Sequence, residues 1–415
     1  MKSRDEQIAR GREARRRLPR NAHGEWTPSA ARDPLAVIRT TEQTRIPELV
    51  PIRRERMSAS AFGFFRGAAD VMAHDLAPRP SSGIDAQICG DAHVLNLGAF
   101  GSPEGKLVFD VNDFDESVRA PFEWDLLRFA TSLVLAGREA GDSAANCDQA
   151  VCAFVHNYRK SMGAFSKLPF IALLSVDVRR IVSAKPVDRV LRKAERAAPA
   201  SLVTKLIDGG KFRDNPPLLL RVDGTDVIAS LGTYEESLWP ERRVAFHRYE
   251  AVDVAFKVSG TGSVGLRDYV VRLRGEASGD VLFLQVKEEP GSCYAPFVPA
   301  EPQHQGRRTA EAQRLMQRTS DPLLGWTSID GRDYLVRQLC DHKAGIEPKD
   351  LGGKALVQYA RVAGSVFARD HARTGDAATI AAYCGSSGRL DHAISRFAAA
   401  YADQTVADHA AFRSI

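Results

Sequence analysis

The amino-acid sequence predicts an α+β fold with a helical part and a β-rich part. Three stretches between residues 252 and 287 are rich in β-branched and alternating apolar side chains, as strands are, and glycines separate the first two. Before residue 165 and after residue 351, apolar side chains instead recur at three- and four-residue spacing, which is typical of helices. The chain has 415 residues, of which 44% are hydrophobic, so it is long enough to bury a sizeable core.

Two predicted strands in the helical part end in acidic and amide side chains. Asp91 follows a strand predicted for residues 84–89, and Asn96 lies five positions later. A second strand ends shortly before Asp113 and Asp115. A carboxylate can accept the proton of an attacking hydroxyl, and carboxylate and amide oxygens are hard ligands that suit Mg²⁺. This combination fits phosphoryl transfer, which depends mostly on positioning and on neutralising charge.

The same acidic residues also fit a simpler interpretation, a β-hairpin with solvated carboxylates at its ends. However, Asp110, Asp113 and Asp115 are so close in the chain that their carboxylates would repel one another strongly unless a cation lay among them. We therefore favour a metal site in which Asp113 is the main magnesium ligand and Asn96 assists it. Asp115 and Asp110 are the alternative ligands, and Asp91 is the predicted catalytic residue.

Glycines join the first two strands of the β-rich part. The sequence from Gly260 to Gly265 has the form G-x-G-x-x-G. In a dinucleotide-binding fold such a sequence opens a helix, whereas in a kinase it covers the phosphates from a β-hairpin. The residues that follow, 268–273, are β-branched and alternating, which favours the kinase arrangement. The third strand ends at Lys287, the position of the kinase lysine that binds the phosphates.

The segments after Lys287 continue this pattern. A helix predicted for residues 307–319 carries Glu311, which is either the ion-pair partner of Lys287, as in a kinase, or only a surface charge. The apolar strand at 334–339 leads into Cys340-Asp341, where a kinase would hold the adenine. The predicted nucleotide-binding residues are Gly260, Thr261, Gly262, Ser263, Gly265, Lys287, Glu311, Arg337, Gln338 and Leu339.

The stretch from Gly90 to Asn96 resembles the catalytic loop, His-Gly-Asp-x-His-x-x-Asn, of aminoglycoside and choline phosphotransferases. Residues 109–116 and 123–126 are similar to the metal-binding Asp of those enzymes and to a later Asp-Leu that opens a helix. This resemblance implies a protein-kinase-like two-lobe fold with ATP and Mg²⁺ as cofactors. It also implies that Asp125 braces the catalytic loop.

Nearly the whole chain more closely resembles a bacterial family, domain of unknown function 2252. Besides the two motifs at 90–96 and 109–116, the stretches that carry this resemblance are Pro51–Arg53, Phe64–Gly67, Gly260–Gly265, Leu284–Lys287 and His371–Arg373. The family name implies no activity, so the expected activity rests on the kinase-like residues.

The order of these motifs differs from that of an ordinary kinase. Here the glycine hairpin and Lys287 follow Asp91 instead of preceding it, so the expected fold is a circularly permuted kinase. A competing topology feeds the catalytic loop from a helix at 61–76 and treats the β-rich part as a late insertion. That helix carries Arg66, which either pairs with a carboxylate or binds a phosphate.

Five segments make up the predicted organisation. They are a basic, partly disordered arm (1–50), the catalytic-loop part of a helical lobe (51–165), an uncertain insertion or substrate region (166–250), a β-rich nucleotide-binding lobe (251–345) and C-terminal helices that pack on the helical lobe (346–415).

The net charge of +5 comes from the first 20 residues, which contain eight Lys or Arg and three Asp or Glu. A solvated arm, with at most weak contact to nucleic acid or anionic lipid, is therefore expected beside a neutral body. No apolar run approaches the length of a membrane span, and the first 20 residues lack the apolar segment of a secretory signal, so neither is expected. The six cysteines are dispersed, which favours reduced thiols and a cytoplasmic location.

Together these observations predict an ATP- and Mg²⁺-dependent phosphotransferase that acts on the hydroxyl of an unidentified small molecule or protein. One alternative is nucleotidyl transfer by a kinase-like site, and another is a non-catalytic nucleotide-binding kinase relative. A third is a metal-dependent phosphoesterase built from His74, Asp75, Asp91, His93 and Asp110. That third alternative leaves the glycine hairpin and Lys287 without a role.

Overall fold

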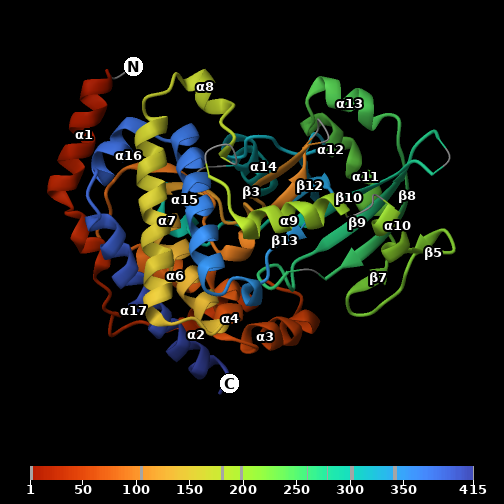
Figure 1. Ribbon diagram of the computed structural model, residues 1–415. Helices are drawn as coiled ribbons and strands as arrows, with labels where there is room; N and C mark the ends of the chain where they lie inside the picture. The colour runs from red at the N-terminus through yellow and green to blue at the C-terminus, as the bar shows by residue number, and fades with distance from the viewer. Residues whose placement is uncertain are drawn as a thin grey trace.

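The computed structural model confirms a mixed α+β fold (Figure 1). It describes residues 3–102, 106–178, 182–196, 200–258, 260–277, 279–299, 303–339 and 344–414. Most helices surround one large hydrophobic core, whereas a six-stranded sheet has a second core of its own. In Figure 1 the helical part lies on the left and this sheet on the right.

Long helices from both halves of the chain build the helical part. Helix α7 packs along α15, and α17 packs against α6 and α7. Their buried side chains belong to the same core, so segments before and after the six-stranded sheet form one body. The bounds of these helices are α6 Glu123–Glu139, α7 Ala144–Phe165, α15 Lys354–Thr374, α16 Ala377–Cys384 and α17 Arg389–Phe412.

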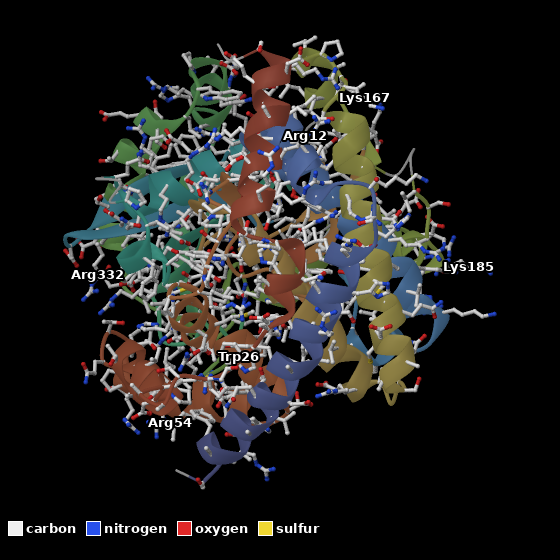
Figure 2. All side chains as sticks on the ribbon, turned by 90° about the vertical axis from the view of Figure 1, so that its left-hand side faces the viewer. Arg12, Trp26, Arg54, Lys167, Lys185 and Arg332 are labelled. Carbon is white, nitrogen blue, oxygen red and sulfur yellow. The ribbon has the colours of Figure 1, made fainter. Side chains whose placement is uncertain are left out.

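The described part of the N-terminal arm, residues 3–50, is mostly helical. Helix α1 (Arg4–Arg17) begins with a capping box at Ser3 and packs against α16. The buried Gly11 and Ala14 allow this close approach, while most of the arginines lie on the solvent side. Figure 2 looks onto this side of the molecule and labels the exposed Arg12. The chain continues through η1 Arg20–Gly24, α2 Pro34–Glu42, η2 Pro47–Leu49 and α3 Val50–Ser58.

The helix expected at 61–76 is divided into α4 (Ala61–Gly67) and α5 (Ala69–Leu76). Ala68 between them has φ −123° and ψ 45°, which is outside the helical region. The carbonyl oxygen of Gly67 accepts a hydrogen bond from the buried guanidinium of Arg53. Because this carbonyl is engaged by a side chain and glycine favours helices weakly, the helix breaks here.

Two small antiparallel sheets carry the predicted catalytic loop. Strand β1 (Asp85–Ile88) pairs with β4 (Val118–Pro121), and β2 (Leu97–Gly101) pairs with β3 (Leu107–Val111). The loop runs from β1 through η3 (Val94–Asn96) into β2. On its other edge β2 pairs with β13 (Ala344–Gly345), which is followed by η6 (Pro348–Asp350).

The larger sheet has six strands, and all neighbouring strands in it are antiparallel. In spatial order they are β11 Gly325–Ile329, β12 Arg332–Gln338, β10 Val281–Glu288, β9 Asp268–Arg274, β8 Glu250–Lys257 and β7 Leu219–Arg221. The predicted glycine hairpin therefore joins β8 and β9, and the predicted lysine strand is β10. Helix α14 (Gln305–Met316) follows β10, after η5 (Ala295–Phe297), and packs against β11 and β12.

The segment at 166–250, whose role was uncertain, is shared between the two parts. Helix α9 packs against β2, β3 and β13 in the helical part, whereas β7 and α12 belong to the six-stranded sheet and its core. The elements of this segment are α8 Phe170–Leu174, α9 Lys185–Arg196, α10 Ala200–Leu206, β5 Ile207–Asp208, β6 Lys211–Phe212, β7, α11 Thr225–Ala229, α12 Leu231–Ser237 and α13 Pro240–Phe246.

Candidate active site

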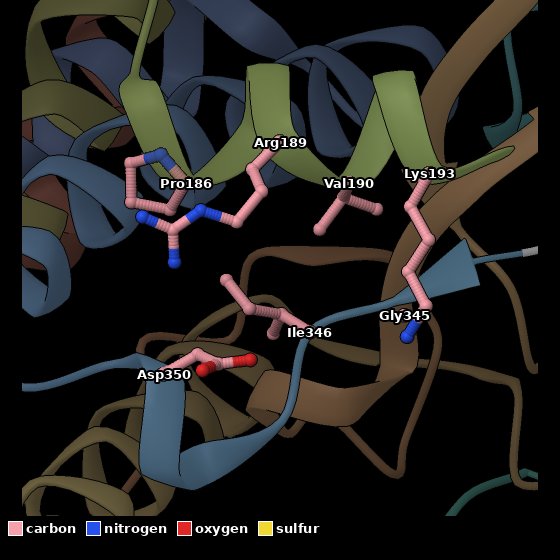
Figure 3. Close-up of a pocket in the computed structure, with 7 residues that line it drawn as sticks. All are labelled: Pro186, Arg189, Val190, Lys193, Gly345, Ile346 and Asp350. Atoms are coloured by element: carbon pink, nitrogen blue, oxygen red, sulfur yellow. The ribbon is translucent and has the colours of Figure 1, made fainter. Parts of the chain in front are cut away.

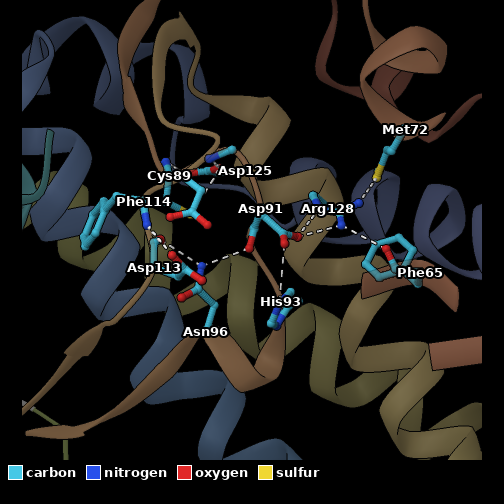
Figure 4. Close-up of polar contacts among 12 residues, drawn as sticks. Phe65, Met72, Cys89, Asp91, His93, Asn96, Asp113, Phe114, Asp125 and Arg128 are labelled. Atoms are coloured by element: carbon cyan, nitrogen blue, oxygen red, sulfur yellow. Dashed lines mark hydrogen bonds and ion pairs between the residues drawn. The ribbon is translucent and has the colours of Figure 1, made fainter. Parts of the chain in front are cut away.

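The loop that carries Asp91 is held at its start by Asp125 of α6, which is drawn close to Cys89 in Figure 4. Gly90 has φ +79°, and a side chain there would collide with the carbonyl of Glu116. Asp125, in the first turn of α6, accepts hydrogen bonds from the backbone N–H of Cys89 at 2.9 Å and of Gly90 at 3.0 Å. This is the contact that the phosphotransferase resemblance implied for Asp125.

Asp125 is itself held by a buried histidine. Nε2 of His371, on α15, lies 3.2 Å from Oδ2 of Asp125, and Nδ1 of His371 lies 2.9 Å from the Tyr158 hydroxyl. Both Asp125 and His371 are fully buried. Three helices from distant parts of the sequence therefore fix the backbone just before Asp91.

The carboxylate of Asp91 has one engaged oxygen and one open oxygen. Oδ1 accepts hydrogen bonds from Nε of Arg128 at 2.8 Å and from an Nη of the same guanidinium at 2.6 Å. Arg128 is fully buried and lies over the Phe65 ring at 4.2 Å. Oδ2 lies 3.6 Å from Nε2 of His93, and the Asp91 side chain is 23% exposed (Figure 4). Arg128 therefore orients Asp91 through Oδ1 and not through Oδ2.

Asn96 joins the loop to the acidic segment after β3. Its Nδ2 donates to the backbone carbonyls of Asp91 and Asp113, each at 3.0 Å. Within the described parts of the chain, Oδ1 of Asn96 and Oδ1 of Asp115 are buried and have no hydrogen-bond partner. Buried oxygens without a donor are what a cation requires.

Lys287, at the end of β10, contacts the carboxylate of Asp115. Its ammonium also lies 3.8 Å from Oδ1 of Asp113 and 3.8 Å from Oε1 of Glu289. Burial alone would lower the pKa of Lys287, but the three carboxylates raise it above its usual range. Burial would raise the pKa of Asp115, but the charge of Lys287 outweighs it and lowers this pKa. For Asp113, burial and the nearby charge of Asp115 raise the pKa.

One face of the six-stranded sheet supplies this basic side of the site. Lys287 pairs in register with Asp268, and Gln285 pairs with Arg337, so these four side chains share a face. Nε of Arg337 donates to Gln285 at 2.9 Å, and its Nη1 lies 3.3 Å from the carbonyl oxygen of Asn112. The carboxylates of Asp113 and Asp115 help to raise the pKa of Arg337 against burial.

Glu311 does not pair with Lys287, so that prediction is wrong. It accepts a hydrogen bond from Arg307 at 2.8 Å, in an exposed i,i+4 pair on α14. The acid near Lys287 is Glu289, two residues later in the chain, and Glu289 also accepts from the hydroxyl of Thr309 at 3.0 Å. Residues two apart in an extended chain point to the same side, so this spacing could have identified Glu289 from the sequence.

The contact between α14 and the acidic segment comes from Arg308. Its guanidinium donates to the backbone carbonyls of Asp115 and Ser117, each at 2.7 Å. This arginine fixes the path of the chain that carries Asp113 and Asp115. Sequence reasoning did not identify it.

The side chain of Asp110 does not join those of Asp113 and Asp115 at Lys287. Its side chain is almost fully buried and pairs with Arg369 of α15, and it also accepts from the backbone N–H of Arg318 at 3.3 Å. Its alternative role as a magnesium ligand is therefore not supported, since a buried arginine already neutralises it. Asp113 and Asp115 remain with Asn96 as the candidate ligands.

The phosphoesterase set of five residues is not assembled either. Asp75 accepts hydrogen bonds from Arg32 and from the Tyr401 hydroxyl, and Asp110 pairs with Arg369. Among the residues that the structure describes, no three His, Cys, Asp or Glu side chains form a group that could hold a metal ion. A magnesium site here would thus depend on the amide oxygen of Asn96 in addition to carboxylates.

The glycine loop is anchored by the N-terminal helices. Gly260 and Gly265 have φ of +58° and +93°. Arg56 donates to the carbonyl of Gly260 at 2.5 Å, Arg45 donates to that of Val264 at 2.5 Å, and the N–H of residue 46 donates to that of Gly265 at 2.8 Å. Of the other predicted loop residues, Gly262 approaches α4, Thr261 is buried and Ser263 is partly exposed.

The predicted adenine-binding strand is β12. The backbone N–H of Gln338 donates to Asp321, and that of Leu339 donates to the carbonyl of Phe283 at 2.8 Å. Cys340-Asp341 lies outside the described residues. A separate pocket lies between α9 and the chain after β13; it is lined by Pro186, Arg189, Val190, Lys193, Gly345, Ile346 and Asp350 (Figure 3). It contains none of the predicted site residues.

The helical part and the six-stranded sheet thus define a two-part α+β protein with a polar site where the parts meet. A family model described as an uncharacterized protein conserved in bacteria, DUF2252, matches residues 45–415. The chain therefore belongs to the DUF2252 family. Searches of curated proteins and of solved structures found no match. None of the helices in the described parts of the chain is long and apolar enough to span a bilayer.

Proposed function

We propose that this protein is an ATP- and Mg²⁺-dependent phosphotransferase with a protein-kinase-like fold in circularly permuted order. The observation that carries the proposal is the contact between Lys287 and Asp115, which are 172 residues apart. Lys287 is the penultimate residue of β10, the strand that follows the glycine hairpin, and Asp115 follows β3, the second strand after the Asp91 loop. Two motifs that a kinase brings together are thus adjacent, although their order in the chain is reversed.

The arrangement of the sheet also supports a kinase-like nucleotide lobe. The glycine hairpin joins two neighbouring strands, the lysine strand β10 lies beside them, and β12 adjoins β10 on its other edge. Helix α14 lies between β10 and β11 in the chain. The helices before and after this sheet share one core, which a permuted order requires of the helical lobe.

Each site residue has a role in this proposal. Asn96 Oδ1, Asp113 and Asp115 would hold magnesium, which would neutralise the charge of the phosphates. Oδ2 of Asp91 would accept the proton of the acceptor hydroxyl. The acceptor oxygen forms a bond to the terminal phosphorus, the bond from that phosphorus to the bridging oxygen breaks, and ADP leaves. Lys287 and Arg337 would bind the phosphates from the sheet.

A thermal-shift measurement tests the nucleotide part of the proposal. ATP with Mg²⁺ at about a hundred times its Kd should stabilise the full-length protein by about 2.7 kcal/mol, and NAD should not. NAD is the matched control because a G-x-G-x-x-G sequence also occurs in dinucleotide-binding folds. Stabilisation by NAD alone would contradict the proposal.

Mass spectrometry tests the reaction. The protein is incubated with ATP, Mg²⁺ and a bacterial extract, and products are compared with those of an Asp91→Asn control. A product that gains one phosphate only with the wild-type protein supports phosphoryl transfer. A product that gains a nucleotide would show that the reaction is nucleotidyl transfer instead of phosphoryl transfer. Identical products in both samples would contradict catalysis at Asp91.

A further inference from the structure

Arg66 lies between the glycine loop and the acidic residues. It occupies the last turn of α4, and its carbonyl oxygen would be 3.7 Å from a Cβ atom placed on Gly262. Burial lowers the pKa of Arg66, while the carboxylates of Asp91 and Asp113 act in the opposite direction. The guanidinium is therefore within electrostatic reach of both predicted site acids, and its backbone approaches the glycine loop.

Unlike the other arginines of the site, Arg66 has a guanidinium without a protein partner in the parts of the chain that the structure describes. Arg128 is bonded to Asp91, Arg308 to backbone carbonyls, and Arg337 to Gln285. Among the described residues, the Arg66 side chain donates no hydrogen bond, and its Nε is buried without an acceptor. A buried guanidinium nitrogen without an acceptor is costly, and a ligand that supplies oxygens would remove this cost.

We propose that Arg66 binds the terminal phosphate of ATP, the group that is transferred. This inference rests on the proposed function and adds a phosphate-binding residue from the N-terminal helices to it. A planar guanidinium can donate two parallel hydrogen bonds to phosphate oxygens, which an ammonium group cannot. Arg66 would thus hold the phosphate near Asp91 and neutralise the charge that develops during its transfer.

The N-terminal helices are suited to this role because they also hold the glycine loop. Arg45, in the turn after α2, and Arg56, on α3, donate to its carbonyls, and Gly262 of the loop lies beside the carbonyl of Arg66 on α4. The position of Arg66 relative to Gly262 is therefore fixed by these same helices.

The test compares the affinities of ADP and a non-hydrolysable ATP analogue, both with Mg²⁺, by calorimetry on the full-length chain. In Arg66→Ala the affinity for the ATP analogue should fall about 10- to 100-fold, because a charge-assisted pair is lost, while that for ADP stays within about threefold. Arg66→Lys should lose part of the preference, since it keeps the charge but not the paired geometry. Arg39→Ala, which removes an exposed arginine on α2, is the control and should bind like the wild type.

The outcomes separate this inference from the proposed function. If the wild type binds neither nucleotide, the proposed function is wrong and Arg66 has no phosphate to bind. If the wild type prefers the ATP analogue and Arg66→Ala keeps that preference, only the role of Arg66 is wrong. An equal loss of affinity for ADP and the ATP analogue in Arg66→Ala would show that Arg66 supports the fold, and it would also overturn the inference. Arg66→Lys decides the matter if Arg66→Ala does not fold.

Discussion

The ammonium of Lys287 and the carboxylate of Asp115 form an ion pair that links the six-stranded sheet to the segment after β3. Lys287 is 4% exposed and Asp115 is 22% exposed, so neither charge is well solvated. Removing one partner of such a pair leaves the other charge without compensation. The pair therefore contributes both to stability and, in our proposal, to nucleotide binding.

Lys287→Met should lower the free energy of unfolding by about 3 kcal/mol and reduce ATP affinity more than tenfold. The double variant with Asp115→Asn tests the stability effect, because it also removes the uncompensated carboxylate. We expect the double variant to regain part of the stability in urea unfolding. Its ATP affinity should stay low, because Asp115 is also a candidate magnesium ligand. Recovery of ATP binding in the double variant would contradict the proposed role of both residues in nucleotide binding.

The two candidate metal acids should differ in what their loss affects. Asp113→Asn should abolish the dependence of nucleotide binding on Mg²⁺, since Asn96, whose Oδ1 is unpartnered among the described residues, donates to the backbone carbonyl of Asp113 and so lies beside it. Asp110→Asn should keep that dependence but lower stability by about 3 kcal/mol, because the buried Arg369 loses a counter-charge. Calorimetric titrations at several Mg²⁺ concentrations measure the first effect, and urea unfolding measures the second. If Asp110→Asn removes the Mg²⁺ dependence and Asp113→Asn keeps it, the metal is bound at Asp110.

Asp91→Asn should reduce turnover without reducing nucleotide affinity. The variant keeps an oxygen for Arg128 but loses the basicity of Oδ2, the open oxygen. A positioned general base contributes about 10²- to 10⁴-fold, so turnover should fall by that factor. Phosphate release or product formation is measured beside the affinity for ATP. If nucleotide binding is lost instead, Asp91 is a metal ligand.

The sequence predicted that Lys287 and Asp113 lie close together, because each belongs to a motif with fixed spacing at a strand end. The sequence could not predict which side of α14 faces the sheet. Ala310 packs with Leu324, just before β11, and with Leu335 of β12, and this contact turns Glu311 outward to Arg307. Helical spacing alone does not show which side of a charged helix is buried.

The sequence also could not decide between Asp110 and Asp113. Residues 108–111 of β3 are buried on both faces, so alternation does not show which way Asp110 points. Its partner Arg369 lies 259 residues later, and no local pattern connects the two. The contacts of the N-terminal helices with the glycine loop also join residues that are far apart in the chain. They depend on how the helical part packs against the six-stranded sheet.

A buried histidine should make the protein sensitive to acid. His23, in η1, is 2% exposed, and its Nε2 lies 2.6 Å from the Tyr383 hydroxyl of α16. Burial, assisted by the charge of Arg79, lowers the pKa of His23 from 6.5 to about 4. The folded protein therefore resists protonation at a pH where the unfolded chain accepts a proton.

The sign of the effect follows from proton linkage. Above pH 6.5 His23 is neutral in both states, so its contribution to stability is fully present. As the pH falls from 6.5 towards 4, the unfolded chain binds a proton that the folded protein does not, and stability decreases. One pKa unit corresponds to about 1.4 kcal/mol, so the loss should approach roughly 3 kcal/mol.

His23→Gln isolates this contribution because glutamine retains a polar group for Tyr383 and does not titrate. We expect the stability difference between wild type and His23→Gln, measured by urea unfolding, to shift by roughly 3 kcal/mol in favour of the variant between pH 7.5 and pH 4. Tyr383→Phe is the matched control: it removes the hydroxyl from the same contact but keeps the histidine, so its stability difference from wild type should be similar at both pH values. A difference between wild type and His23→Gln that does not change with pH would show that His23 is protonated as readily in the folded protein as in the unfolded chain.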